Sequence, residues 1–411
     1  MKRIGTSLIL TILLFFPVIS LSWVCNNQQL KTPVIPLKQK QNLNFTNWAD
    51  YISPELIHCF EKLSNIDIRL SYTTDDNMTR AKVMTGASGF AVIEQGALYL
   101  PDEIASHALL ELDQTKLPNW RYRNRAIYHK IAESDDPGNR YGIVYAYGTT
   151  GIAYNQNAVD QAFDTSGKQH ITPNSWAYLF DSQKLQKLSR CGVSLLDEPE
   201  QVFGNYFYYK GIDPNTTNKA DYERAALYLI DHVRPYITYF DSNKYQNDFT
   251  AGNLCLVMGY SGDVVRSIAR AKVINPKLQL HYVLPEQGTS LWFDMLMIPK
   301  GAKNLKAAYA FLNFNLEPYI AAMNSNYLYQ PNAVEDNRQY LNPIFSNPNV
   351  NPTPAMIKKM YVLKIHPPEF QAFVSTLWMY VKYGIHFTPR YAKHLDNANE
   401  KHARSLQQAC G

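Results

Sequence analysis

The 411-residue sequence lacks the short motifs by which several large enzyme classes are recognised. It has no phosphate-binding P-loop, no GxGxxG fingerprint, no HExxH metal motif and no GxSxG nucleophile elbow. The nearest approach to an elbow, Gly259-Tyr260-Ser261-Gly262, places its second glycine one residue too early. The ten histidines are scattered, with no pair at ligand spacing. We therefore expect a protein that is not an enzyme, with no cofactor and no metal site.

Strong charge of one sign is also missing. The formal net charge is +5, and no run of lysine and arginine occurs. A nucleic-acid-binding surface requires clustered positive charge. We therefore expect no nucleic-acid partner.

Long apolar runs are absent after the first 22 residues. Residues 8–19 are almost wholly apolar, Lys2 and Arg3 precede them, and Ser20-Leu21-Ser22 follows with small residues suited to cleavage. This pattern predicts a secretory signal peptide over residues 1–22. A permanent membrane anchor is the alternative, which the short run and Pro17 disfavour. We expect an exported, periplasmic protein.

Cysteine is scarce and odd in number, and no CxxC or zinc-type spacing occurs. Export permits disulfides, but at least one of the five thiols must be unpaired or pair with another chain. Cys59 lies in the apolar pattern of a predicted helix, so we interpret it as a buried free thiol. Pairing of Cys25 with Cys410 would tie the two ends together, although only their positions suggest it.

Periodicity predicts strands that alternate with helices. After a polar segment, 23–42, which we expect to be a mobile leader, 43–48 is typical of a buried strand. A helix then follows Ser53, a predicted N-cap with Pro54 at the first helical position. Alternating polarity predicts a strand over 66–74, and the same order resumes along much of the chain. This order predicts an α/β fold with a parallel sheet.

The stretch YGIVYAYGTTGIAYN, residues 141–155, breaks the alternation. Two extended runs flank Gly148-Thr149-Thr150-Gly151. We interpret this as a crossing between two lobes through a short hinge. A simple hairpin is the alternative, which spacing alone does not exclude.

What the chain does contain is an aromatic residue beside a carboxylate at the boundaries of predicted elements. The three instances are Trp48-Ala49-Asp50-Tyr51, Tyr260-Ser261-Gly262-Asp263 and Trp292-Phe293-Asp294. Ligands of open α/β sheets bind beyond the carboxyl ends of strands. Aromatic faces attract ammonium groups by about 0.5–2 kcal/mol each, and carboxylates add charge-assisted hydrogen bonds. These residues together predict a slot for an organic amine.

Each element of this slot has a structural alternative. Asp50 is placed to cap the turn before Ser53, and Asp263 is placed to be a helix N-cap while also binding a ligand. Asp294 lies inside an apolar strand, where burial is costly without a partner. Trp48 and Trp292 alone are more typical of a hydrophobic core.

At these residues the chain resembles a known family. LNFTNWADYISPELIHCFEKLSNIDI, CGVSLLDEPEQVF, NLCLVMGYSGDVVRSIARAK, SLWFDMLMIPKGAKN and YLYQPNA are similar to segments of periplasmic polyamine-binding proteins of ABC transporters. The likeness covers most of residues 43–390 and is strongest to the putrescine-binding branch. It implies an α/β, two-lobed periplasmic-binding-protein fold (type II), in which hinge crossovers join two mixed sheets flanked by helices.

The resemblance implies that residues 43–147 and 293–319 form one lobe, and residues 148–292 and 320–411 the other. It further implies a monomer that captures a diamine or polyamine, such as putrescine or spermidine, and delivers it to an inner-membrane permease. The alternative is an organic-cation sensor that presents its closed form to a membrane receptor.

Site residues follow from the same resemblance. The family's binding aromatics map to Trp48, Tyr260, Trp292 and Tyr329, its acids to Asp50, Asp263 and Asp294, and a contact serine to Ser242; Tyr51, Gln95, Glu198 and Gln201 complete the candidate site. The family disulfide maps to Cys191 and Cys255. The chain departs from the family pattern at Ala49, Gln95, Gln201, Tyr260 and Trp292, so these positions favour a changed ligand preference.

Overall fold

We describe a computed structural model of the chain over residues 25–165 and 169–392. The predicted signal peptide and Cys410 lie outside these residues. Within them, no helix is long and apolar enough to cross a membrane.

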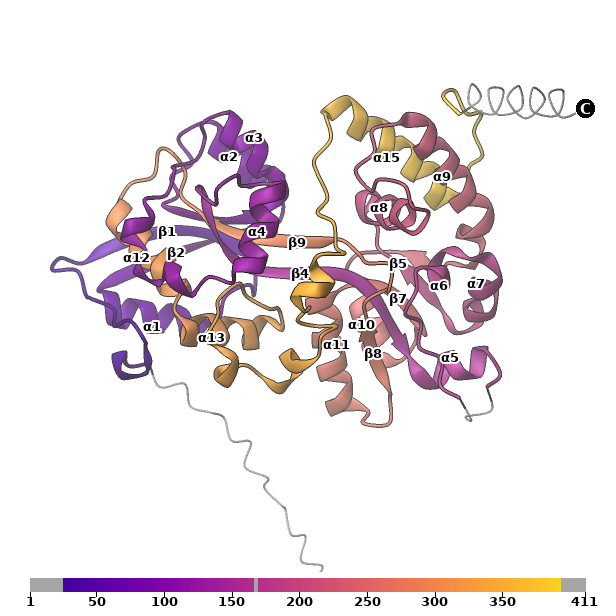
Figure 1. Ribbon diagram of the computed structural model, residues 1–411, viewed down its shortest axis with the longest axis horizontal. Coiled ribbons are helices and arrows are strands. Elements are labelled where there is room, and N and C mark those ends of the chain that lie inside the picture. The colour runs from indigo at the N-terminus through magenta and orange to yellow at the C-terminus, as the bar shows by residue number, and fades with distance from the viewer. Residues whose placement is uncertain (1–24, 166–168, 393–411) are drawn as a thin grey trace, which may run out of the picture.

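Two α/β lobes lie side by side and share one mixed sheet (Figure 1). The strand order is β2-β1-β3-β9-β4-β7-β5-β6, and β8 pairs with β4. Parallel pairs occur within each lobe, whereas β9 and β4 run antiparallel to their neighbours. The strands are β1 (Gln41–Trp48), β2 (Ile66–Thr73), β3 (Val92–Gly96), β4 (Gly142–Asn155), β5 (Val193–Leu195), β6 (Tyr239–Phe240), β7 (Leu256–Tyr260), β8 (Leu280–Val283) and β9 (Leu291–Met297).

The first lobe is built on β1, β2 and β3. Ser53 caps its first helix as predicted, because its hydroxyl oxygen accepts a hydrogen bond from the Leu56 amide. Phe311 packs against Phe45 on β1 and against Phe60 in the apolar core. The helices of this lobe are α1 (Pro54–Ser64), α2 (Asp76–Met84), α3 (Leu100–Ala105), α4 (Arg125–Ser134), α12 (Leu305–Asn315) and α13 (Pro318–Leu328).

The second lobe is built on β5, β6, β7 and β8. Its core includes Phe203 and Phe207 of one helix, packed on Tyr222 of another. The helices here are α5 (Gln156–Ala162), α6 (Ala177–Phe180), α7 (Ser182–Leu188), α8 (Pro199–Tyr209), α9 (Lys219–His232), α10 (Lys244–Ala251), α11 (Ser261–Ile274) and α15 (Pro368–Tyr383), while α14 (Pro354–Ile357) contacts α4 of the first lobe.

Short 3-10 helices occupy many of the connections. They are η1 (Asn27–Gln29), η2 (Ala97–Tyr99), η3 (Gln114–Lys116), η4 (Pro118–Tyr122), η5 (Ser189–Cys191), η6 (Arg234–Tyr236), η7 (Arg338–Tyr340) and η8 (Pro343–Ser346).

The lobes are joined by two long antiparallel strands, β4 and β9. The first half of β4 pairs with β9, and its second half pairs with β7 and β8. Gly148 and Gly151 therefore lie inside one continuous strand, which rules out the hairpin alternative. At Gly151 a Cβ atom would lie 2.5 Å from the Tyr282 hydroxyl, so this glycine makes room for a ring rather than a turn.

The chain returns to the second lobe later than expected. Helix α13 packs on α1 and α12, and the amides of Asn124 and Glu335 bond to carbonyls of Ala333 and Tyr122. Helix α13 and residues 333–335 thus lie against the first lobe, although the resemblance implied a boundary at residue 319.

The described part of the expected mobile leader is fixed to the first lobe. The Lys31 amide donates to a Glu317 carboxylate oxygen at 2.7 Å, and the Leu37 amide donates to the Ser64 carbonyl at 2.9 Å. Cys25 forms a disulfide with Cys59, with a Cα–Cα distance of 5.3 Å. This pairing corrects two expectations, the free thiol at Cys59 and the Cys25–Cys410 pair.

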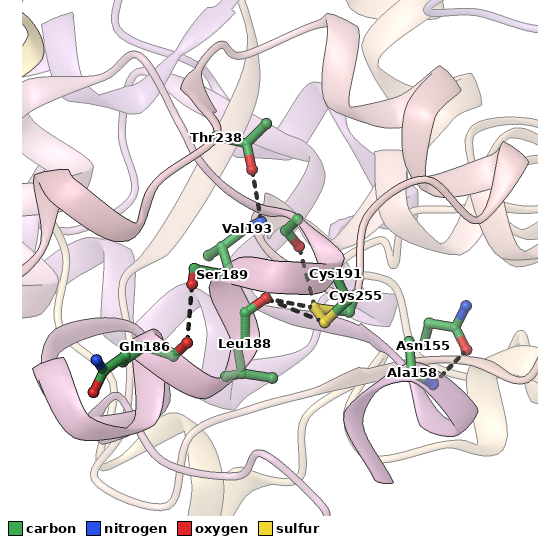
Figure 2. The surroundings of a disulfide bond; sticks show 10 residues. Asn155, Ala158, Gln186, Leu188, Ser189, Cys191, Val193, Thr238 and Cys255 are labelled. Carbon is green, nitrogen blue, oxygen red and sulfur yellow. Dashed lines mark hydrogen bonds between the residues drawn. A yellow bond between two sulfur atoms is a disulfide. The ribbon is translucent and has the colours of Figure 1, made fainter. Parts of the chain in front are cut away.

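The disulfide implied between Cys191 and Cys255 is confirmed, with a Cα–Cα distance of 5.4 Å. Figure 2 shows it next to the Leu188 carbonyl oxygen, which both sulfur atoms approach. Cys191 lies just before β5 and Cys255 just before β7, so the bridge ties the starts of two paired parallel strands.

Candidate ligand-binding site

A cleft of about 830 Å³ lies between the lobes. The first lobe contributes the loop after β1 (48–51), the start of α2 (75–77) and η2 after β3 (96–99). The second contributes the start of α8 and the β7–α11 junction, and β9 forms the floor with residues 290–294. The cleft thus lies beyond the carboxyl ends of β1, β3 and β7, where ligands of open α/β sheets bind.

Negative charge dominates the lining. Eight carboxyl side chains face the cleft, against two from lysine and arginine, Arg266 and Lys364. Aromatic rings lie among them. The acids are Asp50, Asp75, Asp76, Asp135, Glu198, Glu200, Asp263 and Asp294, and the aromatic residues include Trp48, Tyr51, Tyr99, Tyr260, Trp292 and Phe293. Such a surface selects organic cations, because rings and carboxylates both attract ammonium groups.

Asp294 lies at the floor of the cleft in a hydrogen-bond network. The Tyr51 hydroxyl contacts both the Asp294 carboxyl group and, at 2.5 Å, the Gln330 side-chain oxygen. A hydroxyl carries one hydrogen, so one contact needs a proton on Asp294 or a turned Gln330 amide. Burial raises the pKa of Asp294 to about 7, although the hydrogen bond from Tyr51 opposes this rise. One polar partner is therefore present, but no cation among the described residues pairs with Asp294.

Trp292 stands beside Asp294 on the same face of β9. Its ring covers Gly148 of β4, where a Cβ atom would lie 2.1 Å from the ring. The Tyr260 ring packs edge-on against the indole, with centroids 6.1 Å apart. Trp292 and Tyr260 therefore form one aromatic corner of the cleft.

Asp263 lies in the first turn of α11 but does not cap it. Tyr260 occupies the N-cap position, without a side-chain capping bond. The Tyr245 hydroxyl donates to Asp263 at 3.2 Å, and burial raises the pKa of its carboxyl group while the charge of Arg266 opposes the rise. The N-cap alternative for Asp263 is thus wrong, and the side chain faces the cleft.

Asp50 likewise does not cap α1, since Ser53 does. Its backbone is left-handed, with a φ of 56°, and the residue is exposed on the cleft rim beside half-buried Trp48. Asp50 is therefore available to a ligand in the cleft.

The second-lobe wall carries Glu198 and Gln201. Burial and the neighbouring Glu200 raise the pKa of Glu198 to about 7. The Gln201 side-chain oxygen accepts hydrogen bonds from Thr150 at 2.8 Å and Ser290 at 2.7 Å, which fixes it beside the crossing strands. Both residues line the cleft.

Three predicted residues do not line the cleft. Gln95 is fully buried and its amide reaches the Asp76 carbonyl at 3.4 Å. Ser242 lies behind Glu198, and its hydroxyl donates a hydrogen bond to the Glu198 carboxylate at 3.3 Å. Tyr329 packs instead in a small apolar cluster with Val265, and its neighbour Gln330 enters the cleft.

Sequence reasoning missed several lining acids. Asp76 begins α2 and accepts a hydrogen bond from the Gly96 amide at 3.2 Å, and burial raises its pKa to about 6. Glu200 lies in the first turn of α8, and burial raises its pKa. Acids at helix starts are ordinarily interpreted as helix-dipole partners. Their positions in the sequence carry a usable signal, because Asp76 follows β2 and Glu200 follows β5. Both therefore lie at the same edge of the sheet as Asp50.

A metal site finds no support in the described ranges, where no group of three or more His, Cys, Asp or Glu side chains is arranged to hold an ion. What the cleft can do chemically is bind a cationic group by charge-assisted hydrogen bonds and bury a short methylene chain against rings.

Comparison with known proteins agrees with this geometry. Residues 55–334 match the family model of bacterial extracellular solute-binding proteins. The chain is 34% identical over 343 residues to the putrescine-binding periplasmic protein SpuD of Pseudomonas aeruginosa, covering 83% of this chain and 92% of that protein. It is 32% identical over 351 residues to the putrescine-binding periplasmic protein PotF of Escherichia coli, covering 84% and 92% respectively.

The fold is similar to that of a solved structure, the spermidine/putrescine ABC transporter substrate-binding protein PotD from Streptococcus pneumoniae. The TM-score is 0.73 at 23% identity, covering 84% of this chain and 100% of that one. The matched family model spans most of the chain, including both crossing strands and most of the cleft. This chain belongs to the family of bacterial extracellular solute-binding proteins.

Proposed function

We propose that this protein captures a diamine or polyamine in the cleft between its lobes and delivers it to an ABC permease. The observation that carries the proposal is the excess of carboxyl groups over cations in a cleft walled by aromatic rings. The names of the relatives, which include putrescine-binding periplasmic proteins, support the same ligand class.

In the proposed complex, one ammonium group pairs with Asp294 on the floor of the cleft. The methylene chain lies along the Trp292–Tyr260 corner and Trp48, and a second ammonium group pairs with Asp263 or Asp50. Charge-assisted hydrogen bonds of this kind contribute about 1.5–3 kcal/mol each. The amine leaves unchanged, since no step of bond making or breaking is part of this function.

Capture closes the lobes about β4 and β9. Two strands are the narrow connection that hinge motion requires, and closure around a ligand is a known use of this architecture. We further propose that residues 1–22 direct export, and that the mature protein acts as a periplasmic monomer that presents its closed form to the permease.

Thermal unfolding of the purified, ligand-free mature protein tests the proposal. Putrescine, spermidine and agmatine are compared with butanediol, which has the length of putrescine and no charge. A ligand at 100 times its Kd stabilises the folded state by about 2.7 kcal/mol, so the amines raise Tm and butanediol does not. No rise with any of the amines would contradict the proposed function.

A further inference from the structure

Glu94 is a buried carboxyl group on the cleft side of the sheet that the amine site described above does not use. Gly96 of β3 lies opposite Asp294 of β9, and Glu94 precedes Gly96 by two residues. Side chains two apart on a strand share a face, and such diagonal neighbours have Cα atoms about 7–8 Å apart. The side chains of Glu94 and Asp294 are therefore diagonal neighbours on the same face of the sheet.

Neither carboxylate oxygen of Glu94 has a hydrogen-bond partner, and the residue is 0% exposed. The titratable groups that act on it or share its surroundings are Asp294 from β9, Asp76 from α2, Tyr51 from the β1–α1 loop and Tyr145 from β4. Arg80, the arginine of this region, is paired with Asp102 at 2.7 Å. Among the described residues, Glu94 thus has acidic and phenolic neighbours and no positive one.

An unpaired charge in such a place is costly, so the group stays neutral by holding a proton. Burial, followed by the charges of Asp294 and Asp76, raises the pKa of Glu94 well above its ordinary value. Two carboxyl groups that face each other without a cation cannot both ionise, and a cation placed at one of them removes that restriction.

We propose that Glu94 is a further carboxyl group of the amine site, paired with Asp294 and protonated in the ligand-free protein, and that it releases its proton when a ligand's ammonium group binds at Asp294. The inference rests on the proposed function and concerns how that site is regulated. In this step the O–H bond of Glu94 breaks, its electron pair stays on the carboxylate, and the proton passes to the buffer through the cleft. Amine affinity consequently rises with pH.

Calorimetric titration with putrescine at about pH 8 measures this proton. At this pH Asp294, with a pKa of about 7, is already largely ionised, so a released proton comes from another group. Titrations in two buffers of different ionisation enthalpy give the number released. We expect roughly 0.5–1 proton per amine for the wild type and close to zero for Glu94→Gln, which keeps the shape of the side chain.

Glu103→Gln is the matched control. Glu103 is also 0% exposed with two oxygens that lack hydrogen-bond partners, but its charged neighbours are Arg80, Asp76 and Asp102 rather than Asp294. We expect this variant to release the same number of protons as the wild type. Equal release by the wild type and Glu94→Gln, or no release by the wild type, would overturn the inference while leaving amine binding intact.

A measurement without amine separates the two proposals. The infrared band of a protonated carboxyl group should be present in the ligand-free wild type at neutral pH and weaker in Glu94→Gln. The comparison is made with the wild type, because burial raises the pKa of Glu103 to about 8 and this residue also holds a proton at neutral pH. Absence of that difference would overturn the inference. Failure of putrescine to bind a protein that shows the band would overturn the proposed function, and the coupled release with it.

Discussion

The indole ring of Trp292 lies over Gly148, so that a Cβ atom at residue 148 would lie 2.1 Å from the ring. The two residues are directly paired between β9 and β4, the strands that join the lobes. The aromatic corner of the cleft is therefore built on the connection about which the lobes would close.

Gly148→Ala should disturb both folding and capture. Overpacking of this kind costs about 1–3 kcal/mol, because the ring must move from the floor of the cleft. We expect a lower Tm and weaker putrescine binding, measured by thermal unfolding and calorimetry. Trp292→Phe removes the two indole atoms that lie nearest the added Cβ, so the double variant should recover much of the lost stability. A double variant no more stable than Gly148→Ala would contradict this account.

Tyr51→Phe should shift the pH dependence of amine binding upward. The hydrogen bond from Tyr51 lowers the pKa of Asp294, so its loss lets burial raise that pKa further above about 7. Less of Asp294 is then ionised at neutral pH, and putrescine binds several-fold more weakly there but nearly normally at about pH 9. Measurement of Kd as a function of pH tests this shift. Tyr141→Phe is the control, because Tyr141 directly precedes the first residue of β4 and does not line the cleft. An unshifted profile would count against the Tyr51–Asp294 bond.

The ligand-free protein should lose stability as the solution becomes more alkaline. Asp76, Asp294 and Glu198 have folded-state pKa values raised to about 6, about 7 and about 7, above those of an unfolded chain. The folded state then binds more protons than the unfolded one, so their contribution is complete below about pH 4 and disappears as the pH rises through 6–7.

Urea unfolding at about pH 5 and about pH 8 measures this loss. Asp294→Asn removes one of the three groups and should reduce the difference between the two pH values. Putrescine should restore stability most at the higher pH, where the carboxyl groups that pair with it are ionised. Equal stability at both pH values in the wild type and the variant would contradict the account.

The bridge between Cys25 and Cys59 should hold the N-terminal segment on the first lobe. Cys25→Ser opens a loop of 34 residues and should cost about 2–4 kcal/mol in the free energy of unfolding. Peptide mapping without reduction identifies the pairs directly. Recovery of a Cys25–Cys410 peptide in place of Cys25–Cys59 would contradict the described connectivity.

Local patterns predicted the elements well where several signals agreed. Ser53 and Pro54 marked the start of α1, and alternating polarity marked β2. The aromatic–acid pairs also placed Trp48, Tyr260 and Asp294 in one cleft, since each follows or lies on a strand whose end reaches the same sheet edge. Element ends are therefore a usable guide to ligand sites in α/β chains.

The errors in the predicted site and disulfides have a common cause. Each of these positions depends on tertiary packing, which local sequence patterns do not specify. Gln95 and Glu94 are neighbours in β3 and face opposite sides of the sheet, so which of them lies on the same side as Asp294 depends on the register with β9. Tyr329 adopts a left-handed φ of 58° and packs away from the cleft, while Gln330 enters it. The Cys25–Cys59 bridge depends on where the N-terminal segment lies, which no spacing rule gives.

Calorimetry of putrescine binding to the wild type and to Asp294→Ala tests the central claim most directly. We expect a saturable isotherm for the wild type and a loss of more than about tenfold in affinity for the variant, about 1.4 kcal/mol or more. Asp113→Ala, at a half-buried acid outside the cleft, should bind as the wild type does. No binding to the wild type, or full affinity in Asp294→Ala, would contradict an amine site built on Asp294.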